Sequence, residues 1–188
     1  MRISTTGRYG VRIMLDVALH SSARPATRLE IARRQNVTTE YIAQLARHLS
    51  ASGLLVTQRG PGGGYHLGRP AADIRLSDIF LAVNESMAVA PCTTHNAEII
   101  CEHADKCAAR IVWSSLTQII MNFLNTLTLE DLLAIDRQIK KNSADVPYNP
   151  LEFLESRLSE NSQIPDALLA CGYTPTDQSI PDQSSQNN

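Results

Sequence analysis

The sequence predicts a mostly α-helical fold that carries one small β-hairpin. Apolar residues recur at helical spacing over residues 9–19, 39–52 and 112–127. Between the last two stretches, residues 54–58 and 65–67 have the composition of short strands, and a glycine-rich turn separates them. Helix, short helix, turn, amphipathic helix and hairpin follow one another in the order of a winged helix-turn-helix domain. The hairpin is the expected wing, and a long dimerisation helix is expected after this domain.

Capping residues delimit the expected helices of residues 1–70, the predicted DNA-binding domain. Residues 9–19 are predominantly apolar and should form a mostly buried helix. Thr27 and Glu30 have the spacing of a capping box, which predicts a short helix after Thr27. Thr38 is the expected N-cap of the next helix, at about residues 39–52.

The outward face of this helix carries residue types that suit the major groove of DNA. Gln can pair with adenine, Arg with guanine, and Glu with the amino group of cytosine. The glycine-rich turn leaves room for close approach to a narrow surface, and its arginine could enter a minor groove or meet phosphate. Tyr41 could equally belong to the core, and the turn could be a plain hairpin turn. The predicted DNA contacts are Arg2, Thr38, Thr39, Glu40, Tyr41, Gln44, Arg47, Arg59, Gly60, Pro61, Gly62 and Gly63.

Charge is distributed unevenly along the chain. Residues 1–70 hold ten arginines, no lysine and three acidic residues, a net charge of +7, whereas residues 71–188 have a net charge of −9. A basic half beside an acidic half indicates a polyanionic partner for the first half. A solvated charged face is the alternative explanation.

Three of the four cysteines, Cys92, Cys101 and Cys107, lie within sixteen positions. Thiolates are soft ligands of the kind that hold iron–sulfur clusters. The spacing lacks the Cys-x-x-Cys pairs of common structural zinc sites, which argues against zinc. A disulfide, three small buried residues, or a thiol switch through Cys101 and Cys107 are the alternatives. Cys171 stands apart and is expected to be a lone thiol.

Residues 71–110 are predicted to form a connecting helix and a cysteine cluster loop. Residues 74–76 have the composition of a short strand, and Ser77 is the expected cap of a helix that ends near Val83. Met87 to Cys107 has no clear period and is expected to be a loop.

Residues 111–145 are predicted to be dimerisation helices. The apolar stripe between Val112 and Leu127 is larger than a small winged domain can cover, so we expect it to pair with a second copy. Packing against residues 1–20 is the alternative. Residues 128–131 have the pattern of a capping box for one further helix. Residues 146–173 are expected to be a C-terminal extension with one short helix, and residues 174–188 a disordered tail.

The sequence also bears on location and activity. No apolar run reaches the length of a membrane span, and residues 1–6 lack the apolar core of a signal peptide. We therefore expect a cytoplasmic protein with reduced thiols and no membrane contact. There is no Ser-His-Asp order, phosphate loop or nucleotide fingerprint, so an enzyme is not expected.

Several segments resemble the Rrf-two family of winged helix-turn-helix regulators, and most closely its iron–sulfur cluster regulator (IscR-like) branch. The resemblance covers about residues 1–135. It implies a homodimer that binds double-stranded DNA, with a 2Fe–2S or 4Fe–4S cluster held by Cys92, Cys101 and Cys107. The matching segments are residues 1–10, 14–19, the wing sequence Arg-Gly-Pro-Gly-Gly-Gly-Tyr at 59–65, the three cysteines, and residues 123–129.

Two departures from that branch concern the cluster. The loop between Cys92 and Cys101 is longer, and the histidine expected three residues after the last cysteine is Arg110, which cannot ligate iron. The fourth ligand is therefore open between His103, His95, a nearby carboxylate and a group from the partner subunit.

The function expected from the sequence is a regulator that senses iron, redox or nitric oxide status through the cluster. The alternatives are a winged-helix regulator with zinc or a thiol switch, and an iron–sulfur carrier that binds no DNA.

Overall fold

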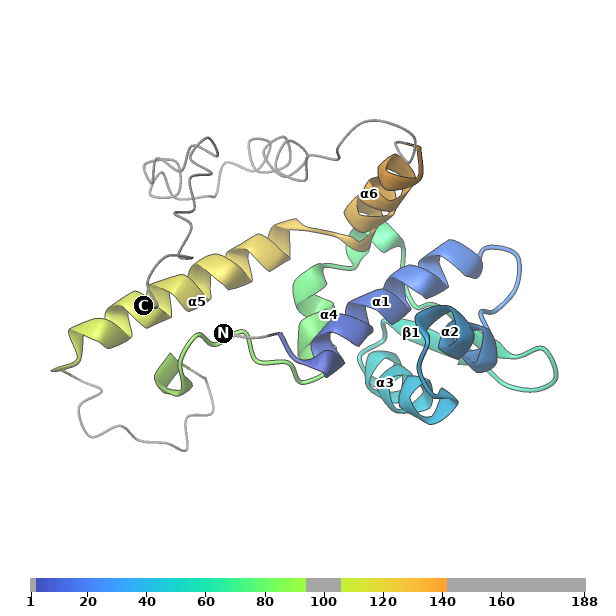
Figure 1. Ribbon diagram of the computed structural model, residues 1–188, viewed down its shortest axis with the longest axis horizontal. Coiled ribbons are helices and arrows are strands. Elements are labelled where there is room, and N and C mark those ends of the chain that lie inside the picture. Colours follow the sequence, from blue (N-terminus) through green and yellow to red (C-terminus); the bar gives the residue numbers. More distant parts are fainter. Residues whose placement is uncertain (1–2, 94–105, 142–188) are drawn as a thin grey trace, which may run out of the picture. The chain divides into compact units, whose positions relative to one another are not determined.

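The computed structural model describes residues 3–93 and 106–141, all within one compact unit that spans Met1–Pro150 (Figure 1). The expected short helix beyond residue 150 and the expected tail at 174–188 lie outside the described residues. The elements are α1 (Thr5–His20), α2 (Arg28–Gln35), α3 (Thr39–Ala51), β1 (Leu55–Gln58), β2 (Gly64–Leu67), η1 (Ala71–Asp73), α4 (Leu76–Ala82), η2 (Pro91–Thr93), α5 (Ala108–Thr126) and α6 (Leu129–Lys141).

Helix α1 begins earlier than the apolar pattern predicts, because Ser4 caps it. The Ser4 side chain accepts a hydrogen bond from the backbone N–H of Gly7 at 3.1 Å. Ile13, Met14 and Val17 are fully buried and form the α1 side of the core. The predicted buried helix is therefore confirmed, and its first turn is set by a polar cap.

The predicted capping box of α2 is confirmed. The Thr27 hydroxyl accepts from the backbone N–H of Glu30 at 3.3 Å, and the Glu30 carboxylate accepts from the backbone N–H of Thr27 at 3.1 Å. Asn36 ends the helix in the left-handed conformation at φ 54°, which asparagine adopts more readily than most residues. This tight turn leads directly into α3.

Thr38 caps α3 as predicted, and the inward residues of α3 follow helical spacing. The Thr38 side chain accepts from the backbone N–H of Tyr41 at 3.2 Å. Ile42, Leu45 and Leu49 are at most 1% exposed. Gly53 follows the helix at φ 70°, a conformation that most side chains resist.

The wing is a two-stranded antiparallel hairpin, β1–β2, as predicted. Leu55 pairs with Leu67, and Gln58 pairs with Gly64 next to the turn. The hairpin is fixed to the segment before α2, because Ala26 and Tyr65 exchange two backbone hydrogen bonds of 2.9 and 3.0 Å. We call the elements α1 to β2 the head.

The prediction that Ser77 caps α4 is wrong. The backbone N–H of Arg75 donates to Asp78 at 3.2 Å, so the helix begins at Leu76 and Ser77 lies inside it. Ser77 is 2% exposed, and its hydroxyl donates to the side chain of Asn125 on α5. The short strand expected at 74–76 is a single bridge between Arg75 and Thr128.

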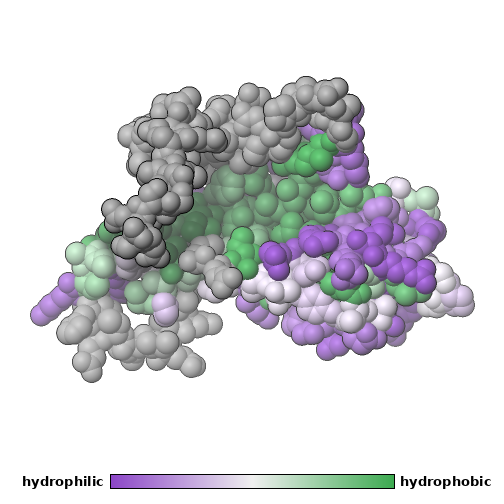
Figure 2. Space-filling model, viewed as in Figure 1, coloured by the Kyte–Doolittle hydropathy of each residue, from purple (hydrophilic) through white to green (hydrophobic). Residues whose placement is uncertain are grey.

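Helices α5 and α6 follow the predicted pattern, with a capping box between them. The Asp131 carboxylate accepts from both the backbone N–H and the hydroxyl of Thr128, at 2.8 and 2.7 Å. Leu124 is the one residue of α5 that is buried by the described part of the chain. Hydrophobic residues predominate on the visible surface of α5 in Figure 2. None of the described helices combines the length and the apolar character that crossing a membrane requires.

Candidate nucleic-acid interface and cysteine segment

Helix α3 turns its predicted contact residues away from the core. Thr38, Glu40, Gln44 and Arg47 are exposed, and Thr39 is half-buried. The opposite face packs against α1 and α2. The polar row is therefore free to face a groove of DNA.

Glu40 is held in its ionised form. The Thr39 hydroxyl donates to its carboxylate at 2.8 Å. This hydrogen bond, the backbone N–H of Glu40 itself and the positive charge of Arg28 lower the pKa of Glu40. An ionised carboxylate only accepts hydrogen bonds, as contact with the amino group of cytosine requires.

Tyr41 of α3, expected either as a DNA contact or as core, packs against α1. Its ring meets the ring of Tyr9 edge-on, with centroids 5.6 Å apart at 87°. Its hydroxyl is buried and has no hydrogen-bond partner in the described part of the chain. The guanidinium of Arg12 lies over the ring of Tyr9, 4.8 Å from its centroid, in a cation–π contact.

The glycines of the wing have structural reasons to be there. Gly60 and Gly62 have φ values of 99° and 76°. A Cβ atom on Gly63 would lie 2.3 Å from the carbonyl oxygen of Gln58, which is too close for any side chain. The turn itself thus explains these glycines. It also leaves Arg59 and Pro61 exposed at the tip.

A charge network around the buried Asp16 joins α1 to α2, and the sequence analysis did not find it. Asp16 on α1 is 3% exposed. The Arg34 guanidinium donates to its carboxylate at 2.6 and 2.9 Å, and the Gln35 amide donates at 2.9 Å. Gln35 also accepts from Arg12 at 2.8 Å. The one available signal was an acidic residue inside the apolar stretch of residues 9–19.

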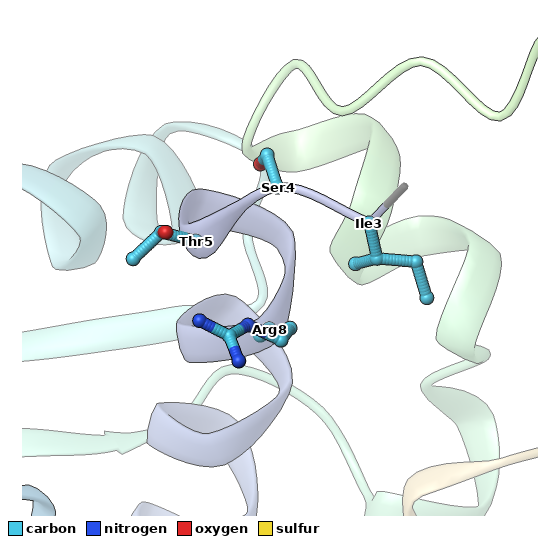
Figure 3. Close-up of a pocket in the computed structure, with 4 residues that line it drawn as sticks. All are labelled: Ile3, Ser4, Thr5 and Arg8. Carbon is cyan, nitrogen blue, oxygen red and sulfur yellow. The ribbon is translucent and has the colours of Figure 1, made fainter. Parts of the chain in front are cut away.

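Some arginines of residues 1–70 are already paired, and others are not. Arg24 binds Glu30, Arg34 binds Asp16, and Arg69 binds Asp78. Arg8, Arg47 and Arg59 form no ion pair with any described residue, so their charges are available to phosphate. Arg8 lies with Ile3, Ser4 and Thr5 around a pocket at the start of α1 (Figure 3). Arg2, another predicted contact, lies outside the described residues.

Two of the predicted cluster ligands are described. Cys92 lies in η2 and Cys107 is the N-cap of α5; both are half-buried free thiols. The Arg110 guanidinium donates to the carbonyl oxygen of Cys92 at 3.3 Å, so the first turn of α5 holds η2 beside it. Cys101 and His103 lie outside the described residues, and the described residues contain no group of three metal-binding side chains. Free thiols are the donors that iron–sulfur clusters use, so these two residues fit such a group chemically.

A helix-turn-helix followed by a two-stranded wing, with an exposed polar row on its third helix, defines a DNA-binding transcription regulator. Residues 3–135 match the Rrf2 family, described as an iron-dependent transcriptional regulator. The chain belongs to the Rrf2 (Rrf-two) family, and the resemblance seen in its motifs is confirmed.

Named relatives are IscR regulators. The HTH-type transcriptional regulator IscR of Serratia proteamaculans (strain 568) is 39% identical over 133 residues, which cover 71% of this chain and 79% of the relative. IscR of Escherichia coli O9:H4 (strain HS) is 36% identical over 156 residues, which cover 81% and 94%. These relatives are transcriptional regulators and not enzymes, as the sequence predicted.

Solved structures with a similar fold include both IscR and CymR proteins. T. potens IscR is 28% identical with a TM-score of 0.59, over 81% of this chain and 96% of that one. CymR (YrzC), the global cysteine regulator of B. subtilis, is 30% identical with a TM-score of 0.58, over 72% and 98%. The oxidized form of Staphylococcus aureus CymR is 28% identical with a TM-score of 0.55, over 69% and 93%.

Proposed function

We propose that the protein is an IscR-like regulator that binds operator DNA as a homodimer and senses iron, redox or nitric oxide status through an iron–sulfur cluster. Cys92, Cys101 and Cys107 are its proposed ligands, with His103 the candidate fourth. The observation that carries the proposal is the contact between Arg110 and the carbonyl of Cys92, which joins the first cysteine to the helix that the last cysteine caps.

In this proposal α3 enters the major groove and the wing follows the adjacent backbone or minor groove. The exposed Glu40, Gln44 and Arg47 read base edges or phosphates, while Thr38 and Thr39 lie at the helix start, where backbone N–H groups favour phosphate. Tyr41 acts through its packing on Tyr9, because its hydroxyl is buried. Arg2 and residues 59–63 complete the proposed contacts.

The cysteine residues would hold a cluster. Its charge and oxidation state would change with the iron supply or the redox conditions. Cys107 begins a helix, and the N-terminus of a helix favours negative charge such as that of thiolates. Arg110 stands in the same turn and binds backbone, so it orients η2 and does not ligate.

Residues 111–145 are the proposed dimerisation region. Ile111, Val112 and Trp113 are 71%, 53% and 39% exposed, although each is large and apolar. A face of this kind on a described helix is usually covered by a partner. A second copy would also give two α3 helices for two half-sites.

A thiol switch or a zinc site without a cluster is the second candidate. The free thiols of Cys92 and Cys107 suit it equally, and one structural neighbour is the oxidized form of a CymR protein. Metal analysis separates the candidates, because a thiol switch needs no metal and zinc brings no inorganic sulfide.

The test is anaerobic purification followed by absorption spectroscopy and assays of iron, sulfide and zinc. We expect visible absorption with iron and sulfide in the wild type, and their loss in the triple variant C92A/C101A/C107A. Cys171→Ala is the matched control, since it removes a thiol outside the proposed site. A triple variant that keeps a full cluster contradicts the ligand assignment.

The proposed DNA contacts are tested by Arg47→Ala in a fluorescence anisotropy titration. Losing a base or phosphate contact should cost about 1–3 kcal/mol of binding free energy. Arg24→Ala is the matched control, because Arg24 is paired with Glu30 and is not a proposed contact. Equal affinities of the two variants would remove Arg47 from the interface.

A further inference from the structure

Glu85, which follows α4 and is far from α1 in the sequence, closes the N-terminus of α1. Its carboxylate accepts from the backbone N–H of Ser4 at 2.9 Å and from the Ser4 hydroxyl. That same hydroxyl accepts from the backbone N–H of Gly7, so cap and carboxylate form one chain of hydrogen bonds. A Cβ atom on Gly7 would lie 3.0 Å from the Glu85 side chain, so any other residue at this position would make that side chain shift slightly.

The contact is also electrostatically favourable for α1. The first turn of α1 contains no acidic residue. A carboxylate at the N-terminus of a helix is stabilised by the helix dipole, and here Glu85 supplies it from another element.

Beyond Glu85 the chain is fixed to α5. The backbone N–H of Val89 donates to the Thr117 hydroxyl at 3.1 Å, and the Thr93 hydroxyl lies 3.1 Å from the same Thr117 oxygen. Cys92 lies between these two anchors. Residues 85–93, here called the strap, therefore contact the start of α1 at one end and carry Cys92 at the other.

We propose that Glu85 is a positioning residue for DNA binding, and that the strap transmits displacement of the cysteine segment to the start of α1. Arg8 lies one turn after Ser4, and its backbone N–H donates to the Ser4 carbonyl at 3.1 Å. Fixing Ser4 thus fixes the turn that presents the charge of Arg8 to phosphate. This inference rests on the proposed operator binding, but it does not require a cluster.

The test is a double-variant cycle on DNA affinity, with Glu85→Ala and Thr117→Val, which break the two ends of the strap. Removal of a negative charge should by itself strengthen binding to DNA. If the strap positions the start of α1, Glu85→Ala should instead weaken DNA binding, by roughly two- to tenfold in affinity. The slope of log affinity against log salt should fall by about one, as for one lost phosphate contact.

The double variant should bind no more weakly than the weaker single variant, because both changes release the same connection. Glu130→Ala is the matched control: it is a half-buried glutamate on α6, paired with Arg137. Glu85→Gln should recover part of the affinity, since an amide oxygen can still accept from Ser4.

The inference is overturned if Glu85→Ala binds as tightly as the wild type or more tightly, or if the two losses simply multiply. Failure of the proposed function looks different, because the wild type would then bind no operator at all. The titration uses whichever wild-type preparation, iron-loaded or iron-free, binds DNA more tightly.

Discussion

The head and helix α5 differ in how far their apolar residues are buried. In the head, apolar residues from α1, α2 and α3 close on one another, and Ile13, Ile31 and Ile42 are fully buried. Along α5, equally apolar residues such as Ile111 and Leu116 remain exposed at 71% and 39%. The head therefore carries its own core, whereas α5 has an apolar face that the described part of its own chain leaves open. Under the proposed function, DNA recognition and assembly use separate surfaces.

The comparison is tested most strongly by the same substitution in both regions. Leu49→Ala in the head should lower the free energy of unfolding by about 2–5 kcal/mol, because it leaves a cavity in a fully buried site. Leu116→Ala on α5 should cost much less at low protein concentration, where a partner is absent. Urea unfolding at two concentrations measures both. Equal losses at the lower concentration would contradict the distinction.

The buried charge of the head gives the next largest effect. Asp16→Ala removes the acceptor of Arg34 and Gln35 and should cost about 1–3 kcal/mol of stability. Asp136→Ala breaks an exposed pair with Lys140 and should cost at most about 1 kcal/mol. Thermal unfolding of both variants checks this order. A harmless Asp16→Ala would mean that packing alone aligns α1 with α2.

The open face of α5 is tested by Val112→Glu. A charge buried in a dimer interface is costly, and a symmetric dimer would contain two. The dissociation constant of the dimer should therefore rise at least about tenfold. The head should be unaffected, because Val112 is 53% exposed within the chain. Analytical ultracentrifugation reports the assembly and circular dichroism the fold. An unchanged sedimentation profile would place the dimer contact elsewhere.

The smallest effect concerns the cap of α2 and depends on pH. The hydrogen bond from Arg24, and then those from the backbone and hydroxyl of Thr27, lower the pKa of Glu30 to about 2 from an ordinary value of 4.5. Because the folded state holds the ionised form, this contribution is complete above pH 4.5 and is lost as the pH falls through 2. Glu30→Gln should therefore lower the melting temperature near pH 6 and have little effect near pH 2. Equal effects at both pH values would contradict this.

Local patterns predicted most of the head and the start of α6. The capping boxes at Thr27 and Thr128, the N-cap Thr38 and the hairpin all depend on residues within a few positions of one another, and so a sequence reveals them. Contacts between distant residues were missed. Ser77 has the composition of a cap, but the N-cap is Arg75, whose backbone N–H donates to Asp78, and the serine hydroxyl donates to Asn125 instead. No spacing rule could pair Glu85 with Ser4, which is 81 positions away.

In the candidate site too, features set by local spacing were predictable, and features set by contacts between distant residues were not. The exposed row on α3 follows from helical spacing, so Gln44 and Arg47 were predictable as outward residues. The burial of the Tyr41 hydroxyl depends on Tyr9, a residue of another helix. The cysteine spacing predicted a metal-binding segment, yet the link between its two ends depends on Arg110, which the sequence offered only as a missing ligand.

The most direct test of the account is the operator affinity of one anaerobic preparation, measured at fixed salt before and after chelation of its iron. We expect the two affinities to differ by roughly five- to a hundredfold, the usual range of coupling between a ligand site and a second site. Identical affinities in a preparation that demonstrably loses its iron and its visible absorption would contradict the claim that the cysteine segment controls the head.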